Sequence, residues 1–395
     1  VTHRSRLRRA LVMCQAALSV VLLVGAVLFV RSLRNVKAHD VGFAVDHLAF
    51  GRVQYDTKDS VRDAGMLARL RALEPRIAAI PGVEHAAITS MRPKWGMAWI
   101  AYFPDADSAG QAKREGFYTG VSPSYFATVG TRLIRGRTFP DNPASAAPYS
   151  VVLDQAMADQ LWPHENPIGH CVRFKESTAP CATVIGIVQN ALFTAIDEKP
   201  SPHFYVSLNQ APFAPRGTLD FVVRTAPPRM AAVQKSVAAL LRAEFPGSIP
   251  TLTTMEQTME PEYRPWQLGA TLFTLFGVLA ALVAGIGIFS TVSYAVSQRT
   301  HEFGIRVALG ARAADVLRQV LGEGLRTVVI GIVIGILMTL AAGRLVASLL
   351  YGIAPNDPSS VAIVAALLLV IATVAALVPA WRAAKADPVS ALRAD

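Results

Sequence analysis

Residues 268–294 read LGATLFTLFGVLAALVAGIGIFSTVSY, an uncharged apolar run that decides the fold class of this chain of 395 residues. At about 1.5 Å of rise per residue, about 20 helical residues cross the roughly 30 Å hydrocarbon layer of a membrane, and this run is longer. Three further runs carry no charge: residues 10–30, 327–343 and 361–380. We therefore predict four transmembrane helices, at residues 10–32, 266–298, 327–350 and 361–380. The third crosses if Arg344 extends its charged end to the interface.

The four predicted helices are unevenly spaced, with one at the N-terminus and three in the last third of the chain. Residues 33–265, between the first and second, contain stretches that alternate like strands and stretches with helical spacing. Two similar β-α-β patterns flank a different middle, which favours a subdomain at about residues 115–210 inserted into the rest. The predicted fold class is thus a four-helix membrane protein with a large α+β domain inserted between helix 1 and helix 2.

The first apolar run could instead be a cleaved signal peptide, since it follows a basic start. It is longer than the usual apolar region of such peptides, however, and it ends in Phe29-Val30-Arg31 instead of a small-x-small cleavage site. We expect a retained membrane helix.

Arginine and lysine near the predicted helix ends indicate the orientation. They are dense in residues 1–9, 299–326 and 381–395, and absent from the short link at 351–360. Because cytoplasmic segments of membrane proteins carry the excess of basic residues, both termini and the 299–326 segment are predicted to be cytoplasmic, with 33–265 on the periplasmic side. The net charge of +10 follows from these flanks, so we expect contact with membrane lipid and no nucleic acid.

Of the three cysteines, Cys14 lies inside the first apolar run, whereas Cys171 and Cys181 lie in the exported region. An oxidising compartment favours a disulfide between these two, and we predict one. Metal binding with His164 and His170 is the alternative, but the spacing matches no standard zinc pattern, so no metal site is predicted.

Sequence motifs for catalysis are missing. The chain contains no G-x-x-x-x-G-K-[ST], no H-E-x-x-H and no G-x-S-x-G. The four apolar runs also lack Asp, Glu and His, which argues against a transporter powered by its own proton relay. We expect a non-enzymatic protein without catalytic residues, whose work is driven by a partner.

The most specific segment is residues 299–312, RTHEFGIRVALGAR, followed by a short amphipathic stretch at 315–321. Here the chain resembles the FtsX/MacB family of ABC transporter permeases, whose corresponding loop reads close to R-x-x-E-[IF]-G-[IL]-R-x-A-L-G-A. The link LLYGIAPNDP at 349–358 and the tail PAWRAAKADPVSALR at 379–393 agree with the same family. Residues 125–139 and 162–169 look like the periplasmic core domain of its MacB-type members, and 266–395 look like the FtsX-like permease domain.

The resemblance implies that the cytoplasmic loop docks on an ABC ATPase, which binds the ATP, so this chain needs no cofactor of its own. A pair of permeases, either a homodimer or two different halves, would pass ATP-driven closure to the periplasmic domains. A periplasmic adaptor and an outer-membrane channel are further candidate partners. The residues that match the docking motif are Arg299, Glu302, Phe303, Gly304, Arg306, Leu309, Gly310 and Ala311.

Departures from the best-known members shape the expectation about partners. Those members carry their own N-terminal ATPase domain, whereas this sequence starts almost at the first apolar run, so we expect the ATPase on a separate chain. The first run, the Cys171–Cys181 segment and the closing residues look most like the second half of duplicated acidobacterial-type permeases. A fragment, or a half encoded separately, would fit.

Two glycines in the third apolar run, Gly331 and Gly335, lie on one helix face and predict close helix packing, within the subunit or across a dimer. For function, we expect export or efflux at the bacterial inner membrane. Lipoprotein release or activation of a cell-wall hydrolase would use the same mechanism. A ligand-binding receptor is the alternative from another class, but the last 15 residues are too short for a signalling domain.

Overall fold

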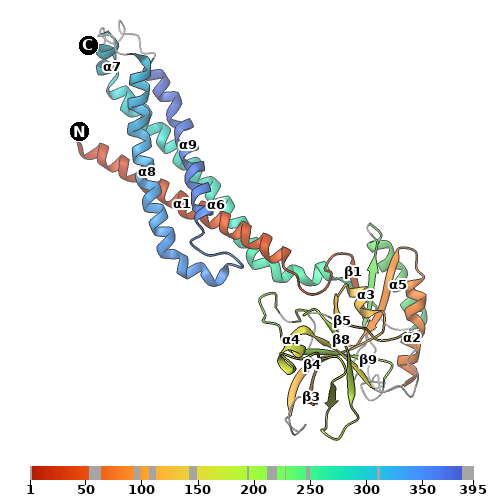
Figure 1. Ribbon diagram of the computed structural model, residues 1–395. Helices are drawn as coiled ribbons and strands as arrows, with labels where there is room; N and C mark the ends of the chain where they lie inside the picture. Colours follow the sequence, from red (N-terminus) through yellow and green to blue (C-terminus); the bar gives the residue numbers. More distant parts are fainter. Residues whose placement is uncertain are drawn as a thin grey trace. The chain divides into compact units, whose positions relative to one another are not determined.

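The computed structural model divides the chain into two compact units, residues 1–38 with 263–395 and residues 39–262. It describes residues 2–52, 64–92, 98–105, 113–141, 149–193, 195–210, 220–226, 228–245, 250–308 and 312–384. Figure 1 shows the first unit as a set of long helices and the second as a mixed α and β structure.

The helical unit has four helices that are long and apolar enough to cross a membrane, so four such helices, as predicted, are present. The elements of this unit are α1 (Thr2–Ala38), α6 (Met255–Gln298), α7 (Thr300–Ala308), α8 (Ala313–Val346), the short 3₁₀ helix η1 (Ala347–Leu349) and α9 (Pro358–Ala384).

Several helices run beyond the predicted spans. Helix α6 starts at Met255, not at 266, and α8 starts at Ala313, not at 327. Charged residues such as Arg264 and Arg326 end an apolar run without ending a helix, because arginine is a good helix former. The predicted bounds therefore marked where the apolar stretches stop, and the helices continue past them.

Helix α1 packs on two neighbours at once. Its contacts with α8 run in parallel: Met13 and Ala17 of α1 lie against Gly331 and Gly335 of α8. Its contacts with α6 run antiparallel, where Phe273 lies over Gly25 and the Phe29 and Phe273 rings stack with centroids 5.1 Å apart. Glycines on α1, α6 and α8 thus let side chains and backbones of neighbouring helices approach closely.

Among its described residues, the α+β unit contains one connected sheet of eleven strands and four helices. The strands are β1 (Leu48–Arg52), β2 (Val83–Thr89), β3 (Ala98–Pro104), β4 (Arg114–Val121), β5 (Leu133–Gly136), β6 (Ser150–Asp154), β7 (Cys171–Phe174), β8 (Ala182–Val188), β9 (His203–Ser207), β10 (Asp220–Thr225) and β11 (Thr251–Thr254). The helices are α2 (Ala64–Ala78), α3 (Tyr125–Val129), α4 (Gln155–Leu161) and α5 (Met230–Glu244).

Six of the strands close into a ring, in the order β4-β3-β7-β8-β6-β9, with β9 pairing back to β4 in parallel. Closure leaves these strands without a free edge. The ring starts at β3, so the different middle of this unit begins near residue 98, earlier than the predicted 115. Its buried side chains include Tyr102, Leu153 and Phe204.

Of the other strands, β5 pairs with β8 of the ring, and four more, in the order β11-β1-β10-β2, carry α2 and α5 on one face. Leu73 and Ile77 of α2 and Val237 and Leu241 of α5 are fully buried against this sheet. The two β-α-β patterns expected at the ends of the domain therefore share one sheet and one core, because β10 from the second pattern inserts between β1 and β2 of the first.

Candidate functional site

The segment that carries the docking motif forms a helix at one end of the helical unit. A turn at Arg299 separates α6 from α7, and the N–H of Phe303 donates to the Arg299 carbonyl. Gly304, expected to set a tight loop, lies inside α7. Leu309, Gly310 and Ala311 lie outside the described residues.

Phe303 points into the protein. Its side chain is 3% exposed and belongs to the same apolar cluster as Val316 and Val320 of α8 and Ala380 and Ala383 of α9. Phe303 matches the docking motif, but in this structure its ring packs inside the chain and does not lie on the outer surface of α7. Burial of a large aromatic ring fixes α7 onto the ends of α8 and α9 instead.

The outer face of α7 is formed by Glu302, Ile305 and Arg306, all exposed. Ile305, which the sequence analysis did not select, is 39% exposed, although an isolated apolar side chain at the surface is common. Because α7 is a helix, residues three and four positions apart share a face, and this groups Glu302 with Ile305 and Arg306. Phe303 lies on the side of α7 next to Arg306 and points toward α8 and α9.

Two arginines of the motif bond to α8. The Nη1 of Arg299 donates to the Glu323 carboxylate at 3.2 Å, and the Nη1 of Arg306 donates to the Gln319 Oε1 at 2.7 Å. Both pairs are exposed, and exposed ion pairs contribute little to stability. The two contacts show that α7 and the turn before it lie beside the first part of α8. Side chains of both helices therefore contribute to one surface.

The two packing glycines lie at the interface of α8 with α1. A Cβ placed on Gly331 would be 2.7 Å from the Ala16 Cβ, and one on Gly335 would be 2.6 Å from the Val20 Cβ. Contacts this short admit no side chain. In this structure the pair therefore packs within the chain, which was one of the two alternatives.

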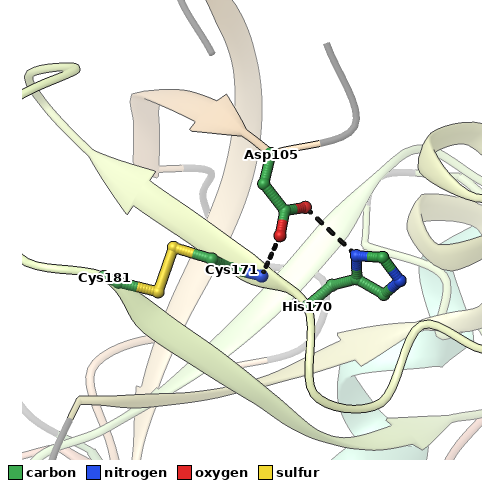
Figure 2. Close-up of a disulfide and its surroundings, with 4 residues drawn as sticks. All are labelled: Asp105, His170, Cys171 and Cys181. Atoms are coloured by element: carbon green, nitrogen blue, oxygen red, sulfur yellow. Dashed lines mark hydrogen bonds and ion pairs between the residues drawn. A yellow bond between two sulfur atoms is a disulfide. The ribbon is translucent and has the colours of Figure 1, made fainter. Parts of the chain in front are cut away.

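In the α+β unit, a disulfide joins Cys171 to Cys181 across the turn between β7 and β8, with the two Cα atoms 5.6 Å apart (Figure 2). Asp105 lies beside it and accepts a hydrogen bond from the Cys171 N–H at 2.8 Å and faces His170 Nδ1 at 3.3 Å. Among the described residues, no group of three or more His, Cys, Asp or Glu side chains is placed to hold a metal ion.

A buried polar pair lies on the closed ring. One oxygen of Asp154 accepts the N–H of Met157 at 2.8 Å, capping α4, and the N–H of His203 at 3.2 Å. Burial raises the pKa of Asp154 to about 7 and lowers the pKa of His203 to about 3. The His203 Nε2 lies 2.9 Å from the Thr119 hydroxyl. These contacts join four elements of the fold, β4, β6, β9 and α4, which is a structural role.

The fold and these sites define a class of protein: a multi-pass membrane protein whose helical unit has a short surface helix at one end and which carries a large α+β domain. Two family models match the chain. The MacB-like periplasmic core domain matches residues 10–240 and the FtsX-like permease C-terminal domain matches residues 274–388. This chain belongs to the MacB-type, FtsX-like permease family, and the predicted family and fold class are confirmed.

Known proteins with similar sequences include two exporters. The probable syringafactin export ATP-binding/permease protein SyfD of Pseudomonas syringae pv. syringae is 31% identical over 285 residues, which are 70% of this chain and 43% of that protein. The macrolide export ATP-binding/permease protein MacB of Agrobacterium fabrum is 28% identical over 286 residues, again 70% of this chain and 43% of that protein. The matches thus span less than half of either relative.

Among solved structures, the periplasmic region of MacB from Actinobacillus actinomycetemcomitans aligns with a TM-score of 0.40 at 14% identity, over 57% of this chain and 97% of that one. The assignment to the family rests on the two family models.

Proposed function

We propose that this chain is the permease subunit of an ABC transporter of the MacB/FtsX type at the bacterial inner membrane. A separate ATPase hydrolyses ATP, and this chain transmits the resulting movement to the α+β domain in the periplasm and so drives export or efflux. The termini, α7 and the start of α8 face the cytoplasm in this proposal, and residues 39–262 face the periplasm.

One observation carries the proposal: α7 is anchored on α8 and α9 by one buried side chain, and part of its surface is exposed. Phe303 is buried against α8 and α9, while Glu302, Ile305 and Arg306 of the same helix stay exposed. A partner that pushes on the exposed surface would move α8 and α9 with it, since the buried ring links the three helices. Exposed charges such as Glu302 and Arg306 can give specificity and speed to association with a partner of complementary charge.

The relatives support the same proposal. Both SyfD and MacB are named ATP-binding/permease proteins of export systems. This chain matches less than half of each relative. In our proposal the ATPase is a separate chain that docks on α7. The spans contain no acidic residue or histidine for an ion-driven mechanism, which leaves hydrolysis by a partner as the energy source.

The test is affinity purification of the tagged chain from native membrane in mild detergent, followed by identification of the bound proteins. We expect an ABC ATPase to co-purify with the wild type and to be lost with Glu302→Lys and reduced with Arg306→Glu. The matched control is Glu260→Lys, the same charge reversal at an exposed residue near the start of α6, far along that helix from α7. ATPase recovery with Glu302→Lys at the wild-type level would rule out the docking role.

A further inference from the structure

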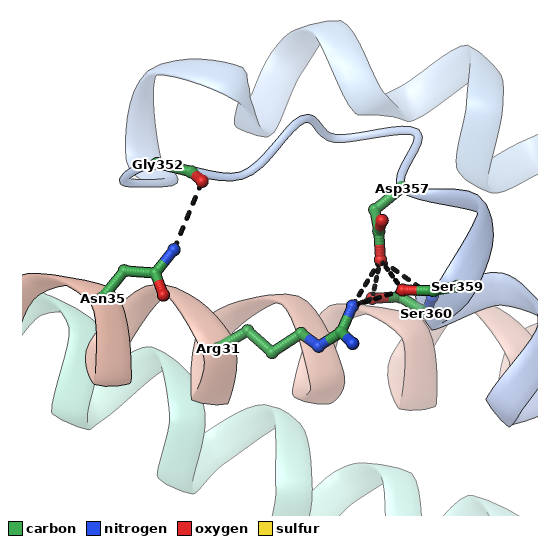
Figure 3. A network of polar contacts seen from close by, with 6 residues as sticks. All are labelled: Arg31, Asn35, Gly352, Asp357, Ser359 and Ser360. Carbon is green, nitrogen blue, oxygen red and sulfur yellow. Dashed lines mark hydrogen bonds and ion pairs between the residues drawn. The ribbon is translucent and has the colours of Figure 1, made fainter.

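The connection between α8 and α9, residues 347–357, is fastened to α1. The hydroxyl of Ser32 accepts the N–H of Tyr351 at 2.7 Å. The Asn35 amide donates to the Gly352 carbonyl at 3.2 Å, as Figure 3 shows. Gly352 has a φ of +65°, a conformation that other residues rarely adopt, so the turn at this contact depends on glycine.

The start of α9 is fastened to the same helix by an ion pair. Asp357 precedes α9 and caps it, because its Oδ2 accepts the N–H of Ser360 at 2.8 Å. The Nη1 of Arg31 donates to this same oxygen at 2.5 Å and also contacts the hydroxyls of Ser359 and Ser360 (Figure 3). These hydroxyls, with the Ser360 N–H, lower the pKa of Asp357 to about 2, so the carboxylate stays charged.

Helix α6 reaches the same connection from another side. The indole N–H of Trp266 donates to the Leu349 carbonyl at 3.0 Å, and its ring lies edge-on to Tyr351, with centroids 6.2 Å apart. No local sequence pattern connects Arg31 with Asp357, which lies 326 positions away. Together these contacts bind the link to both α1 and α6.

These two helices are the ones that continue into the α+β unit. Helix α1 ends at Ala38, where that unit begins, and α6 starts at Met255, within it. Helices α8 and α9 contact Phe303 of α7 at the start of α8 and the end of α9, which are the ends away from the link. The link therefore adds polar contacts between α1 and the two helices that anchor α7, and it also contacts α6, which continues into α7 through the turn at Arg299.

Helix packing by itself allows small sliding movements of one helix along another. The glycine contacts between α1 and α8 and the ring contacts between α1 and α6 are of this apolar kind. A charge-assisted hydrogen bond is directional and roughly twice as strong as a neutral one, so it fixes two helices at one point.

We propose that the 347–357 link passes movement of α7, α8 and α9 to α1 and α6, with Arg31 as the positioning residue that keeps α1 and the link moving as one body. The inference rests on the proposed function, because the movement has to come from an ATPase docked on α7.

The experiment uses the full-length chain with its co-purifying ATPase in lipid nanodiscs. Cys14 is replaced by serine, and spin labels are placed at Ala38→Cys and Ala354→Cys, two small exposed residues at the end of α1 and in the link. The distance between the labels is measured without nucleotide and with a non-hydrolysable ATP analogue. We expect the wild type to give one narrow distribution that is the same in both states.

In Arg31→Gln and in Asp357→Asn we expect that distribution to broaden and to shift when the nucleotide binds, while the ATPase still co-purifies at the wild-type level. Asparagine also caps helices well, so Asp357→Asn removes the ion pair and keeps the start of α9. The double variant should be no worse than either single one. The matched control is Arg34→Gln, an exposed arginine one turn along α1, which should behave as wild type.

Wild-type distributions in both states for Arg31→Gln and Asp357→Asn would overturn the inference. A wild-type chain that brings down no ATPase would instead overturn the proposed function, and the transmission role with it. The two failures are distinguishable, because the first is read from the label distances and the second from the purification.

Discussion

The helical unit and the α+β unit of this chain are held together in different ways. In the helical unit, glycines of one helix receive aromatic or aliphatic side chains of the next, and the polar contacts of Figure 3 cluster near the helix ends. In the α+β unit, the six-stranded ring closes on itself, buries Asp154 and His203, and has a disulfide across one hairpin. Helices that pack by apolar shape can slide, whereas a closed ring of hydrogen-bonded strands resists such change. This contrast fits our proposal, in which the helices shift and the α+β unit is carried as a rigid body.

The largest effect is expected where the helical unit has its one buried aromatic anchor for α7. Phe303→Ala should cost about 3–5 kcal/mol locally, because removal of a buried ring loses its burial and leaves a cavity. Helix α7 should then detach, which hydrogen exchange of residues 300–308 measures directly. In Ile305→Ala the exchange of α7 should stay as in the wild type, since that side chain is exposed. Equal protection of α7 in Phe303→Ala and wild type would contradict the anchoring.

The second effect concerns the α+β unit, whose stability should depend on its disulfide. Cys181→Ser should lower the stability of the α+β unit by roughly 2–4 kcal/mol, as expected for loss of a covalent loop closure. Thermal unfolding followed with and without reductant measures it: the wild type should lose stability with reductant, and the variant should not respond. Cys14→Ser is the control, since that thiol is free. Alkylation of Cys171 and Cys181 in the unreduced wild-type chain would show that the bond is absent.

The glycine contacts offer a smaller effect in the helical unit. Gly335→Leu should destabilise the α1 and α8 pair by about 1–3 kcal/mol, because the new side chain meets Val20 and the backbone of Ala17. Gly322→Ala provides the control, as a Cβ there has nothing within 4 Å. Melting of the detergent-solubilised protein, monitored by size-exclusion chromatography, gives both values. If Gly335→Leu and Gly322→Ala melt alike, the close packing is wrong.

The smallest effect is the dependence of stability on pH. It is small because the two buried groups Asp154 and His203 change the stability with pH in opposite directions. The raised pKa of Asp154 means that the folded state binds more protons than the unfolded state between about pH 4 and 7, so its contribution to stability is lost as pH rises through that range. The lowered pKa of His203 has the opposite sign between about pH 3 and 6.5, where stability rises with pH.

Asp154→Asn keeps the cap of α4 and removes one of the two titrations. The melting temperature of this variant should therefore rise more steeply between pH 4 and 6.5 than that of the wild type, and the two curves should run parallel above pH 7. Melting curves over pH 4 to 8 measure the difference. Parallel curves over the whole range would show that Asp154 does not titrate there.

The sequence predicted the parts of the molecule that depend on local pattern. Uncharged runs predicted the four membrane helices, which the structure has. The segment from Arg299 to Arg306 predicted where a partner would dock, and this stays a prediction. The sequence could not show that Phe303 faces inward, since one helix turn contains both inward and outward positions and only the packed helices decide between them. Contacts between distant residues were equally out of reach. Arg31 and Asp357 are 326 positions apart, and the pairing of β9 with β4 that closes the ring depends on register.

A photoreactive amino acid in place of Ile305 tests the central claim most directly, in living cells and without purification. Our account predicts a covalent adduct between this chain and an ABC ATPase on illumination, and none when the same amino acid replaces Leu268, an exposed apolar residue at the other end of the helical unit. Absence of any ATPase adduct at position 305, with the chain present in the membrane, would contradict the claim that an ABC ATPase docks on α7 and drives this protein.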